Sequence, residues 1–258
     1  MKALRELYDY REMIVGLVKR DLRGRYKGSV LGFLWTFINP LLQLLVYTMV
    51  FSVILKNGIE KYYIFLFVAL VPWMFFSTSV AGGSTSVLAS DSMVKKIYFP
   101  REVLPISYVT SSFVNMFLCF LVVFAVLLVT GFGINFVALL YLPIIMIVEY
   151  FLALGFTLLS SALTVYFRDL AYILNIITMA WQYLTPVVYS EEQVPERFRF
   201  VMQWNPMTSV ITAYRDILYY KQAPELSTLL MATVLGLAFV VIGYVVFRKL
   251  QKGFAEEM

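Results

Sequence analysis

Long uncharged runs alternate with short charged segments along the chain. No charged residue occurs in the 28 positions between Lys27 and Lys56 or in the 29 positions between Lys61 and Asp91. About 20 residues of apolar helix cross the hydrocarbon core of a bilayer, so each run is long enough to span it. The 46 uncharged residues at 103–148 are too many for one crossing, and the turn-forming sequence GFGIN at 131–135 divides them. The pattern predicts six membrane-spanning helices, at about residues 31–55, 62–79, 106–129, 136–165, 170–189 and 226–247.

The composition agrees with a membrane protein and excludes a soluble globule. Hydrophobic residues make up 61% of the 258 positions and charged residues 14%, against about 45–50% and 25% in a soluble domain. So few charges cannot cover a soluble surface of this size, and the expected fold class is an all-α integral membrane protein. The sequence contains no histidine and a single cysteine, Cys119. This excludes histidine acid–base chemistry, Cys/His metal sites and an intrachain disulfide.

Lysine and arginine are distributed unevenly over the two sides of the predicted helices. The successive connections carry 8, 2, 3, 0, 1, 4 and 3 of them, so alternate sides hold 15 and 6. The positive-inside rule places the richer side, and with it both termini, in the cytoplasm. This topology accounts for the net charge of +5 without a nucleic-acid partner. The first 27 residues lack an apolar core followed by a small-residue cleavage site, so a cleaved signal peptide is not expected there.

Two of the predicted cytoplasmic segments are amphipathic. Within 11–26, four apolar residues at helical spacing face away from the basic ones and predict a helix in the headgroup layer. These apolar residues are Ile14, Leu17, Val18 and Leu22. The connection at 91–105 predicts a short helix that Pro100 ends, with apolar side chains available to a soluble partner.

The predicted external connection between spans five and six is also structured. Pro195 can open one helix, and the pair Asn205-Pro206 separates it from a second that extends to Tyr220. Both are too short to cross the membrane, and they predict a lid over the external mouth. The chain therefore divides into an amphipathic cytoplasmic segment at 1–30 and a six-helix transmembrane domain at 31–258.

Polar side chains recur at helical spacing inside several predicted spans. The first span carries four of them, four residues apart, and the third and fifth spans add three more: Trp35, Asn39, Gln43 and Tyr47, then Ser111, Asn115 and Gln182. Polar groups are costly in lipid, so these stripes should face other helices or an aqueous path. Two interpretations stay open. The groups either hold helices together by hydrogen bonds, or line a channel for a polar, uncharged substrate such as a sugar chain.

Glu149 is the one acidic residue deep within a predicted span. A carboxylate at such depth is by default a candidate functional acid. A structural role, with Arg215 or a neighbouring amide as its partner, is an equal alternative.

Several motifs together resemble the permease subunit of ABC-2-type exporters, in the branch that exports lipid-linked O-antigen, capsular polysaccharide or teichoic acid. They cover nearly the whole chain, and their order and spacing make the resemblance specific. The motifs are KRDLRGRYKGSVLG at 19–32 leading into Trp35 and Asn39-Pro40, KKIYFP at 95–100 with Pro105, YFRDL at 166–170, TPVVY at 185–189, and Asn205-Pro206-Met207 followed by Arg215.

The resemblance implies a role for each segment. Residues 11–27 resemble the family's interface helix, and 195–220 its paired external gate helices, with Asn205, Pro206, Met207 and Arg215. Residues 91–100 resemble the coupling helix that contacts an ATPase. The coupling residues would be Met93, Val94, Lys95, Ile97, Tyr98 and Phe99.

The family works as two permeases with two ATP-binding cassette subunits, and this sequence contains no GxxxxGK[ST] phosphate-loop motif. ATP and Mg²⁺ are therefore expected on the partner. This chain is expected to have no catalytic site, cofactor or metal of its own.

The leading hypothesis is a homodimeric permease of the bacterial inner membrane that exports an undecaprenyl-linked polysaccharide through a channel between its helices. The lipid anchor would enter between the interface helix and the bilayer surface. The main alternative is an ABC-2-type exporter of a drug or lipid. A membrane enzyme such as a prenyl or glycosyl transferase is disfavoured because this sequence has no Asp-rich metal motif and no cluster of acidic residues on the predicted cytoplasmic side. A secondary transporter is disfavoured because Glu149 is alone and no internal repeat is evident.

Overall fold

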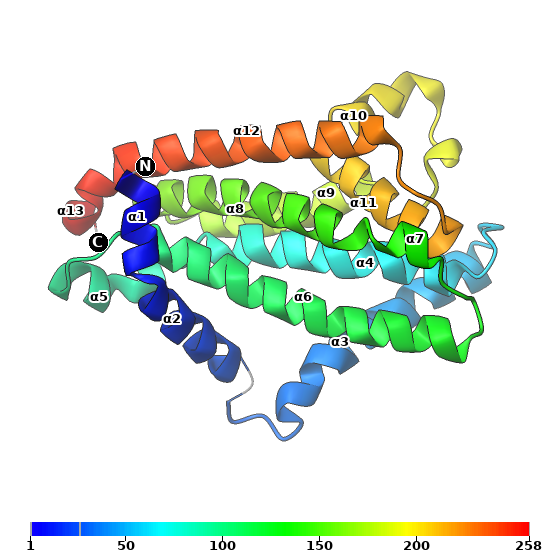
Figure 1. Ribbon diagram of the computed structural model, residues 1–258, viewed down its shortest axis with the longest axis horizontal. Helices are drawn as coiled ribbons and strands as arrows, with labels where there is room; N and C mark the ends of the chain where they lie inside the picture. The colour runs from blue at the N-terminus through cyan, green and yellow to red at the C-terminus, as the bar shows by residue number, and fades with distance from the viewer. Residues whose placement is uncertain (1, 26, 258) are drawn as a thin grey trace.

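The chain folds into a bundle of long helices that run side by side (Figure 1). The structure is a computed structural model that describes residues 2–25 and 27–257, and no strand occurs in these ranges. The long helices are α3 (Trp35–Thr48), α4 (Tyr62–Ser77), α6 (Val103–Val129), α8 (Leu142–Tyr166), α9 (Leu170–Leu184) and α12 (Leu226–Leu250). The shorter helices are α1 (Lys2–Asp9), α2 (Arg11–Gly24), α5 (Asp91–Lys96), α7 (Phe136–Leu139), α10 (Arg199–Gln203), α11 (Pro206–Arg215) and α13 (Phe254–Glu257). Helices α3, α4 and α11 continue as π-helical turns over Met49–Ile54, Thr78–Gly82 and Asp216–Tyr220.

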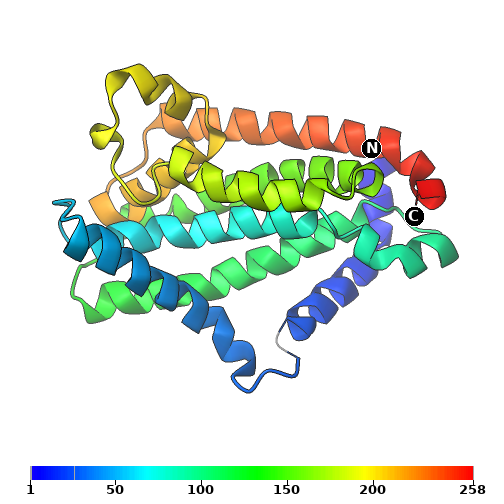
Figure 2. The ribbon, with the colours of Figure 1, turned by 180° about the vertical axis from the view of Figure 1, so that it is seen from behind.

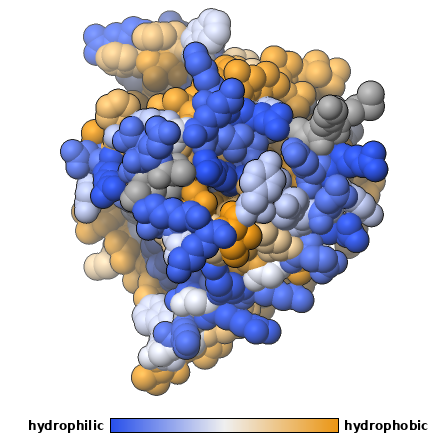
Figure 3. Space-filling model, turned by 90° about the vertical axis from the view of Figure 1, so that its left-hand side faces the viewer, coloured by the Kyte–Doolittle hydropathy of each residue, from blue (hydrophilic) through white to orange (hydrophobic). Residues whose placement is uncertain are grey.

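The two ends of the bundle differ in what they carry. Helices α1, α5 and α13 gather at one end, which we call the terminal end, and α7, α10 and α11 gather at the other, the opposite end (Figure 1). Figure 3 views the terminal end, where hydrophilic side chains cover most of the face around a small hydrophobic patch, and hydrophobic side chains lie along much of the margin. This is the distribution expected where the end of a membrane bundle meets water.

Among the residues that the structure describes, five helical segments are long and apolar enough to cross a membrane. They are Gly32–Ile54, Tyr62–Gly82, Val103–Val129, Phe136–Tyr166 and Leu226–Gly253. They correspond to five of the six predicted spans, with bounds that differ by a few residues. The break predicted inside the longest uncharged run is confirmed. Gly131 and Gly133 take positive φ there, and the Asn135 side chain caps α7 by accepting hydrogen bonds from two backbone N–H groups.

The fifth predicted span is shorter than hydropathy indicated. Helix α9 has 15 residues and ends at Leu184, whereas the prediction continued to Tyr189. Thr185 is extended (φ −107°, ψ 138°), because the following Pro186 disfavours a helical conformation of the residue before it. The segment 185–189 is instead free to accept hydrogen bonds from the opposite-end helices.

Helix α4 forms the centre of the bundle and α3 its periphery. In the most apolar window of each span, 83% of the α4 residues are buried but only 6% of the α3 residues. Both ribbon views show α4 among α6, α8 and α9, while the N-terminal half of α3 leans away from the bundle (Figures 1 and 2). Rings from α4, α8 and α9 meet edge to face: Phe76, Phe156 and Trp181 have centroids 5.2–5.6 Å apart, a favoured aromatic geometry.

Helices α8 and α12 pack backbone against backbone. A Cβ atom added at Gly155 would overlap the main chain of Phe239, and one added at Gly243 would overlap the Gly155 carbonyl oxygen. Small residues permit such close approach, which matters in lipid because apolar side chains gain little by leaving it. Phe156 and Phe239 stack beside the glycines with centroids 4.1 Å apart. This contact fixes the position of α12.

The apolar face of α2 packs on α6. Leu17 on this face is buried and α2 contacts α6, while the expected location of the helix in the headgroup layer stays a prediction. The predicted helix end at Tyr26 falls outside the described residues, and α2 itself ends at Gly24.

Candidate functional site

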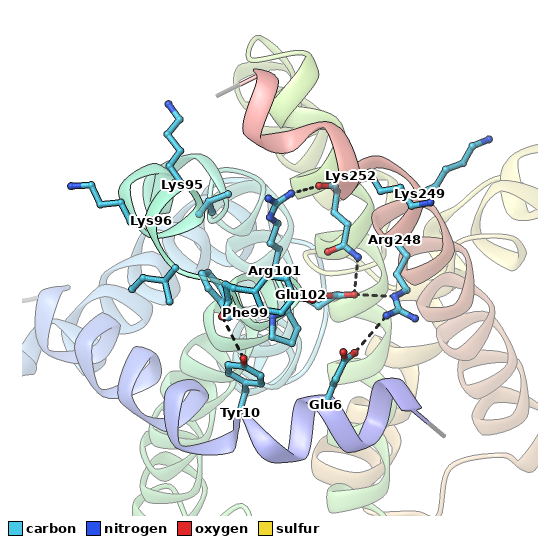
Figure 4. A pocket seen from close by; sticks show the side chains of 15 residues that line it. Glu6, Tyr10, Lys95, Lys96, Phe99, Arg101, Glu102, Arg248, Lys249 and Lys252 are labelled. Atoms are coloured by element: carbon cyan, nitrogen blue, oxygen red, sulfur yellow. Dashed lines mark hydrogen bonds and ion pairs between the residues drawn. The ribbon is translucent and has the colours of Figure 1, made fainter.

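A cleft of about 1250 Å³ opens at the terminal end of the bundle (Figure 4). Its walls come from distant parts of the sequence: α1, the end of α5 with the segment that follows it, and the last turn of α12. We call it the terminal cleft. Its lining residues are Glu6, Tyr10, residues 94–102, Arg248, Lys249, Gln251 and Lys252.

Polar contacts join the walls of the terminal cleft (Figure 4). The Glu102 carboxylate accepts a hydrogen bond from Gln251 Nε2 at 3.2 Å and pairs with Arg248 Nε at 3.4 Å. Arg248 also pairs with Glu6 of α1 at 3.6 Å, and Arg101 donates to the Gln251 carbonyl. The Glu102 side chain is only 5% exposed, so solvent screens its ion pair weakly. The contacts tie the segment before α6 to the end of α12.

The structure separates the six predicted coupling residues. Lys95, Ile97 and Tyr98 are exposed, Met93 is half-buried, and Val94 and Phe99 are buried. Tyr98 is 92% exposed, while its backbone carbonyl accepts a hydrogen bond at 3.4 Å from Tyr10 Oη, which lies between α1 and α2. The expectation that Val94 and Phe99 are presented to a partner is corrected. Both pack into the bundle and support the exposed residues from beneath.

The polar stripe of α3 remains largely uncovered by this chain. Trp35 and Asn39 are exposed, and Gln43 donates to Asn39 Oδ1 at 3.3 Å within the same helix. A hydrogen bond joins the stripe to another helix, from Gln182 Nε2 on α9 to Tyr47 Oη at 3.3 Å. The structure therefore brings Gln182 to Tyr47, while Trp35, Asn39 and Gln43 contact polar partners within their own segment.

The remaining two predicted channel residues lie on α6. Ser111 is fully buried, donates to the Asp21 carboxylate and accepts from Arg25 Nη2 at 3.1 Å. It serves the contact between α2 and α6, which corrects its placement in a channel. Asn115 is half-buried, with its amide nitrogen 3.9 Å from Cys119 Sγ.

Asn205 joins α11 to the end of α9 at the opposite end. Its Oδ1 accepts from the Met207 backbone N–H and from Trp181 Nε1, both at 3.0 Å. Its Nδ2 donates to Thr185 Oγ1 at 2.8 Å and to the Leu184 carbonyl at 3.2 Å. Pro206 follows as the first residue of α11, and Met207 is fully buried. The predicted gate motif is thus a helix cap that also fixes where α11 begins.

Arg215 fixes the other end of α11. Its guanidinium donates to the carbonyls of Val187 at 2.8 Å and Tyr189 at 3.4 Å, and lies 3.6 Å from the ring centroid of Phe65 on α4. Burial lowers the pKa of Arg215 to about 9, opposed by nearby tyrosine and glutamate side chains, so the group remains charged at neutral pH. Burial also raises the pKa of the neighbouring Asp216 carboxyl, although a hydrogen bond from Gln222 acts against this rise.

Glu149 is fully buried between α8 and α11. Its Oε2 accepts a hydrogen bond from Tyr214 Oη at 2.7 Å. The alternative in which Arg215 is its partner is corrected, since that side chain turns to the carbonyls after α9. Glu149 therefore gives α11 a third attachment, to the helix core.

The sequence analysis did not identify several residues whose hydrogen bonds and ion pairs join the helices at the two ends of the bundle. They are Arg101, Glu102, Arg248 and Gln251 at the terminal end, and Trp181 and Tyr214 at the opposite end. Charges at the ends of predicted spans were the available signal for the first group. In the described ranges, no cluster of three or more His, Cys, Asp or Glu is placed to hold a metal ion.

Comparison with known proteins identifies the family. The family model for ABC-2 type transporters matches residues 13–219. The chain belongs to the ABC-2 type transporter family. It is 32% identical to the O-antigen export system permease protein RfbA of Myxococcus xanthus, over the whole of both chains. A protein of the same name from Klebsiella pneumoniae is 32% identical over 95% of this chain and 94% of its own. The polysialic acid transport protein KpsM of Escherichia coli is 21% identical over 87% and 89%.

The family match in this ABC-2 type transporter runs from α2 to the π-helical turn after α11. It includes α5, the polar stripe and the opposite-end helices. Helix α12, which supplies the second wall of the terminal cleft, follows the family match but lies within the full-length similarity to the Myxococcus protein.

Proposed function

We propose that this chain is the permease subunit of an ATP-driven exporter that moves a lipid-linked polysaccharide of the O-antigen type across the bacterial inner membrane. The observation that carries the proposal is the full-length similarity to O-antigen export permeases, at 32% identity with 94–100% of each chain covered. Similarity over this length includes both ends of the bundle and all helices between them.

In this proposal the terminal end faces the cytoplasm and receives a separate ATP-binding subunit. The positive-inside rule supports the orientation, because 15 of the 21 basic residues lie on that side of the predicted spans. The exposed side chains of Ile97 and Tyr98 support the docking role. ATP and Mg²⁺ bind to the partner, and this chain converts the partner's motion into transport.

Two copies of the chain are proposed to enclose the path of the glycan. Exposed amides such as Asn39 are costly in lipid, and a second copy facing α3 and α9 would cover them. The glycan would then pass along Trp35, Asn39 and Gln43, where hydroxyls can exchange hydrogen bonds with amides. The undecaprenyl anchor would remain in membrane lipid beside α2.

Reconstituted transport tests the proposed function. The permease and its ATP-binding partner are placed in liposomes with a fluorescently labelled undecaprenyl-linked O-antigen oligosaccharide. We expect ATP-dependent protection of the label from an added glycosidase, with none when the partner cannot hydrolyse ATP. Transport of an unglycosylated lipid or a drug, with no movement of the glycan, would contradict the proposal.

Tyr98→Asp should weaken binding of the ATP-binding subunit by about tenfold, because an exposed aromatic residue at a contact is a frequent source of binding energy. The free energy of unfolding should change by no more than about 0.5 kcal/mol, since the side chain is exposed. The measurement is the dissociation constant of the complex in nanodiscs. Tyr8→Asp, on exposed α1 at the same end, is the matched control. Equal affinity of the two variants would exclude Tyr98 from the interface.

Trp35→Ala, Asn39→Ala and Gln43→Ala should each lower glycan transport severalfold while changing the free energy of unfolding by less than about 0.6 kcal/mol. The structural reason is that these side chains bond within their own segment: Gln43 to Asn39, and Trp35 to Ser29 at 3.0 Å. Leu45→Ala, an exposed apolar position of the same helix, is the control. Stability that falls in proportion to transport would assign the stripe to helix packing.

A further inference from the structure

The terminal cleft has more positive charge than its own acidic groups neutralise. Six basic and two acidic residues line it, and Arg248 pairs with both acids. Lys95 pairs with Asp91 at 2.9 Å. Within residues 2–25 and 27–257, no ion pair is present for Lys96, Lys249 or Lys252. These three ammonium groups leave a surplus of charge at the mouth of the cleft.

The surplus lysines stand on both walls of the terminal cleft. Lys96 ends α5 on one wall. Lys249, in the last turn of α12, and Lys252, in the 3-10 turn Gln251–Gly253 after it, stand on the other wall. Figure 4 shows their side chains pointing outward on opposite sides, with Phe99, Arg101 and Glu102 between the walls. The exposed side chains of Ile97 and Tyr98 also lie at this cleft. An occupant would therefore meet apolar contacts on one wall and positive charge on both.

We propose that the terminal cleft is a two-walled docking site for an acidic element of the ATP-binding subunit, in which the end of α12 contacts the partner together with α5. This inference rests on the proposed function, which supplies the partner. Carboxylates on the docking element would neutralise Lys96, Lys249 and Lys252, while an apolar residue contacts Tyr98. Complementary charge of this kind accelerates encounter and fixes the register of a complex.

The buried contacts beneath the cleft hold its two walls at a fixed separation. Glu102 bonds to Gln251 and pairs with Arg248, and Arg101 donates to the Gln251 carbonyl. A preformed site loses less conformational freedom on binding than one that must assemble around its partner. The same contacts transmit force, because a partner that moves α5 also moves the end of α12. Glu102 is thus a positioning residue for the docking site.

Binding of the ATP-binding subunit to charge-reversed permease tests the two-walled site. The permease is held in nanodiscs of zwitterionic phosphatidylcholine, and its dissociation constant for the partner is measured at about 50 and 500 mM salt, where screening is weak and strong. We expect Lys249→Glu with Lys252→Glu to bind about tenfold more weakly than wild type at the lower salt, because like charges then oppose each other. The difference should shrink at the higher salt.

The matched control is Arg5→Glu with Arg168→Glu, two exposed basic residues, one on α1 and one between α8 and α9, that do not line the cleft. It changes the net charge equally but lies outside the cleft, and it should bind as wild type does. If both double variants weaken binding equally, the overall charge of the permease determines the affinity, and the proposal of a local site is overturned. Unchanged affinity of the Lys249 and Lys252 variant would also overturn it, including the case in which these lysines contact only anionic lipid.

Two outcomes of this binding experiment distinguish failure of this inference from failure of the proposed function. If wild-type permease does not bind the ATP-binding subunit at all, the proposed function and this inference fail together. If wild type binds and the cleft variant binds equally well, this inference fails alone.

Glu102→Gln tests whether the contacts of Glu102 hold the two walls of the cleft at a fixed separation. It should weaken binding while Glu6→Gln, which removes the exposed arm of the same ion-pair chain, has a smaller effect.

Discussion

Arg215→Met should loosen the opposite end of the bundle, raising passive leak of small solutes severalfold without ATP. The free energy of unfolding should fall by about 2–4 kcal/mol, because two carbonyl groups lose a charged donor. Val187, whose carbonyl accepts the 2.8 Å hydrogen bond, is completely buried, so water cannot replace the lost donor at once. The variant also loses the contact of the guanidinium with the Phe65 ring.

The leak follows from the way α11 is attached. Asn205 fixes its first turn to the end of α9, Tyr214 bonds to Glu149, and Arg215 fixes its last turn to the segment after α9. Without Arg215, the last turn of α11 loses its attachment to the segment after α9 and keeps the Tyr214 bond to Glu149 on α8. In the proposed orientation this helix covers the external mouth of the glycan path, and a path wide enough for sugars must be closed at rest to retain ions.

The measurement is efflux of a trapped small solute from liposomes that contain the permease and its ATP-binding partner. Arg199→Met is the matched control, because Arg199 is half-exposed at the same end and pairs only weakly with Glu196, at 4.0 Å. Arg215→Lys should leak less than Arg215→Met, since one ammonium group can still donate to one of the two carbonyls. Unchanged leak together with lost transport would assign α11 to release of the substrate.

Hydropathy predicted most of the bundle because a lipid-facing helix must consist of uncharged residues over its whole crossing. The same reasoning failed at the end of α9. Residues 185–189 are as apolar as a span requires, but Thr185-Pro186 ends the helix for a steric reason that hydropathy does not contain. The sequence contained both the apolar run and the Thr185-Pro186 pair, and the local effect of the proline determined where the helix ends.

Partners of buried polar groups were less predictable. Glu102 and Gln251 are 149 positions apart, and no periodicity relates the ends of two different helices. Glu149 was expected opposite Arg215 or an amide, yet it bonds to the adjacent residue Tyr214. Successive residues on a helix point about 100° apart. Which residue of α11 bonds to Glu149 therefore depends on the face that α11 turns toward α8. The attachments of Asn205 and Arg215 fix that face.

For the predicted coupling residues at 93–99, the sequence could not show which side chains are exposed and which are buried. Val94, Ile97, Tyr98 and Phe99 are all apolar or aromatic, and α5 has only six residues. No alternation distinguishes an inward side from an outward one in so short a stretch. Packing into the bundle makes the distinction: Val94 and Phe99 join the buried core, whereas Ile97 and Tyr98 remain outside.

Gly243→Leu should prevent normal packing of α8 on α12 and lower the free energy of unfolding by about 3 kcal/mol or more, at the upper end of overpacking effects. Even a Cβ atom at this position overlaps the Gly155 carbonyl oxygen, and backbone cannot move aside as a flexible side chain can. Gly16→Leu is the same substitution at an exposed glycine of α2 with nothing within 4 Å, and it should be tolerated. Gly236→Ala, whose Cβ would lie 3.4 Å from the Val148 carbonyl, should have a small effect.

The effect of Gly243→Leu should reach the terminal end. Arg248 lies five residues further along α12, and its 3.4 Å ion pair with Glu102 depends on where that helix lies against α8. Affinity for the ATP-binding subunit should therefore fall along with thermal stability, whereas Gly16→Leu changes neither. Both quantities are measured on the same nanodisc samples. If Gly243→Leu unfolds at a lower temperature but binds the partner as wild type does, the end of α12 is not part of the interface. If its unfolding temperature is unchanged, the backbone contact between α8 and α12 does not exist in the membrane.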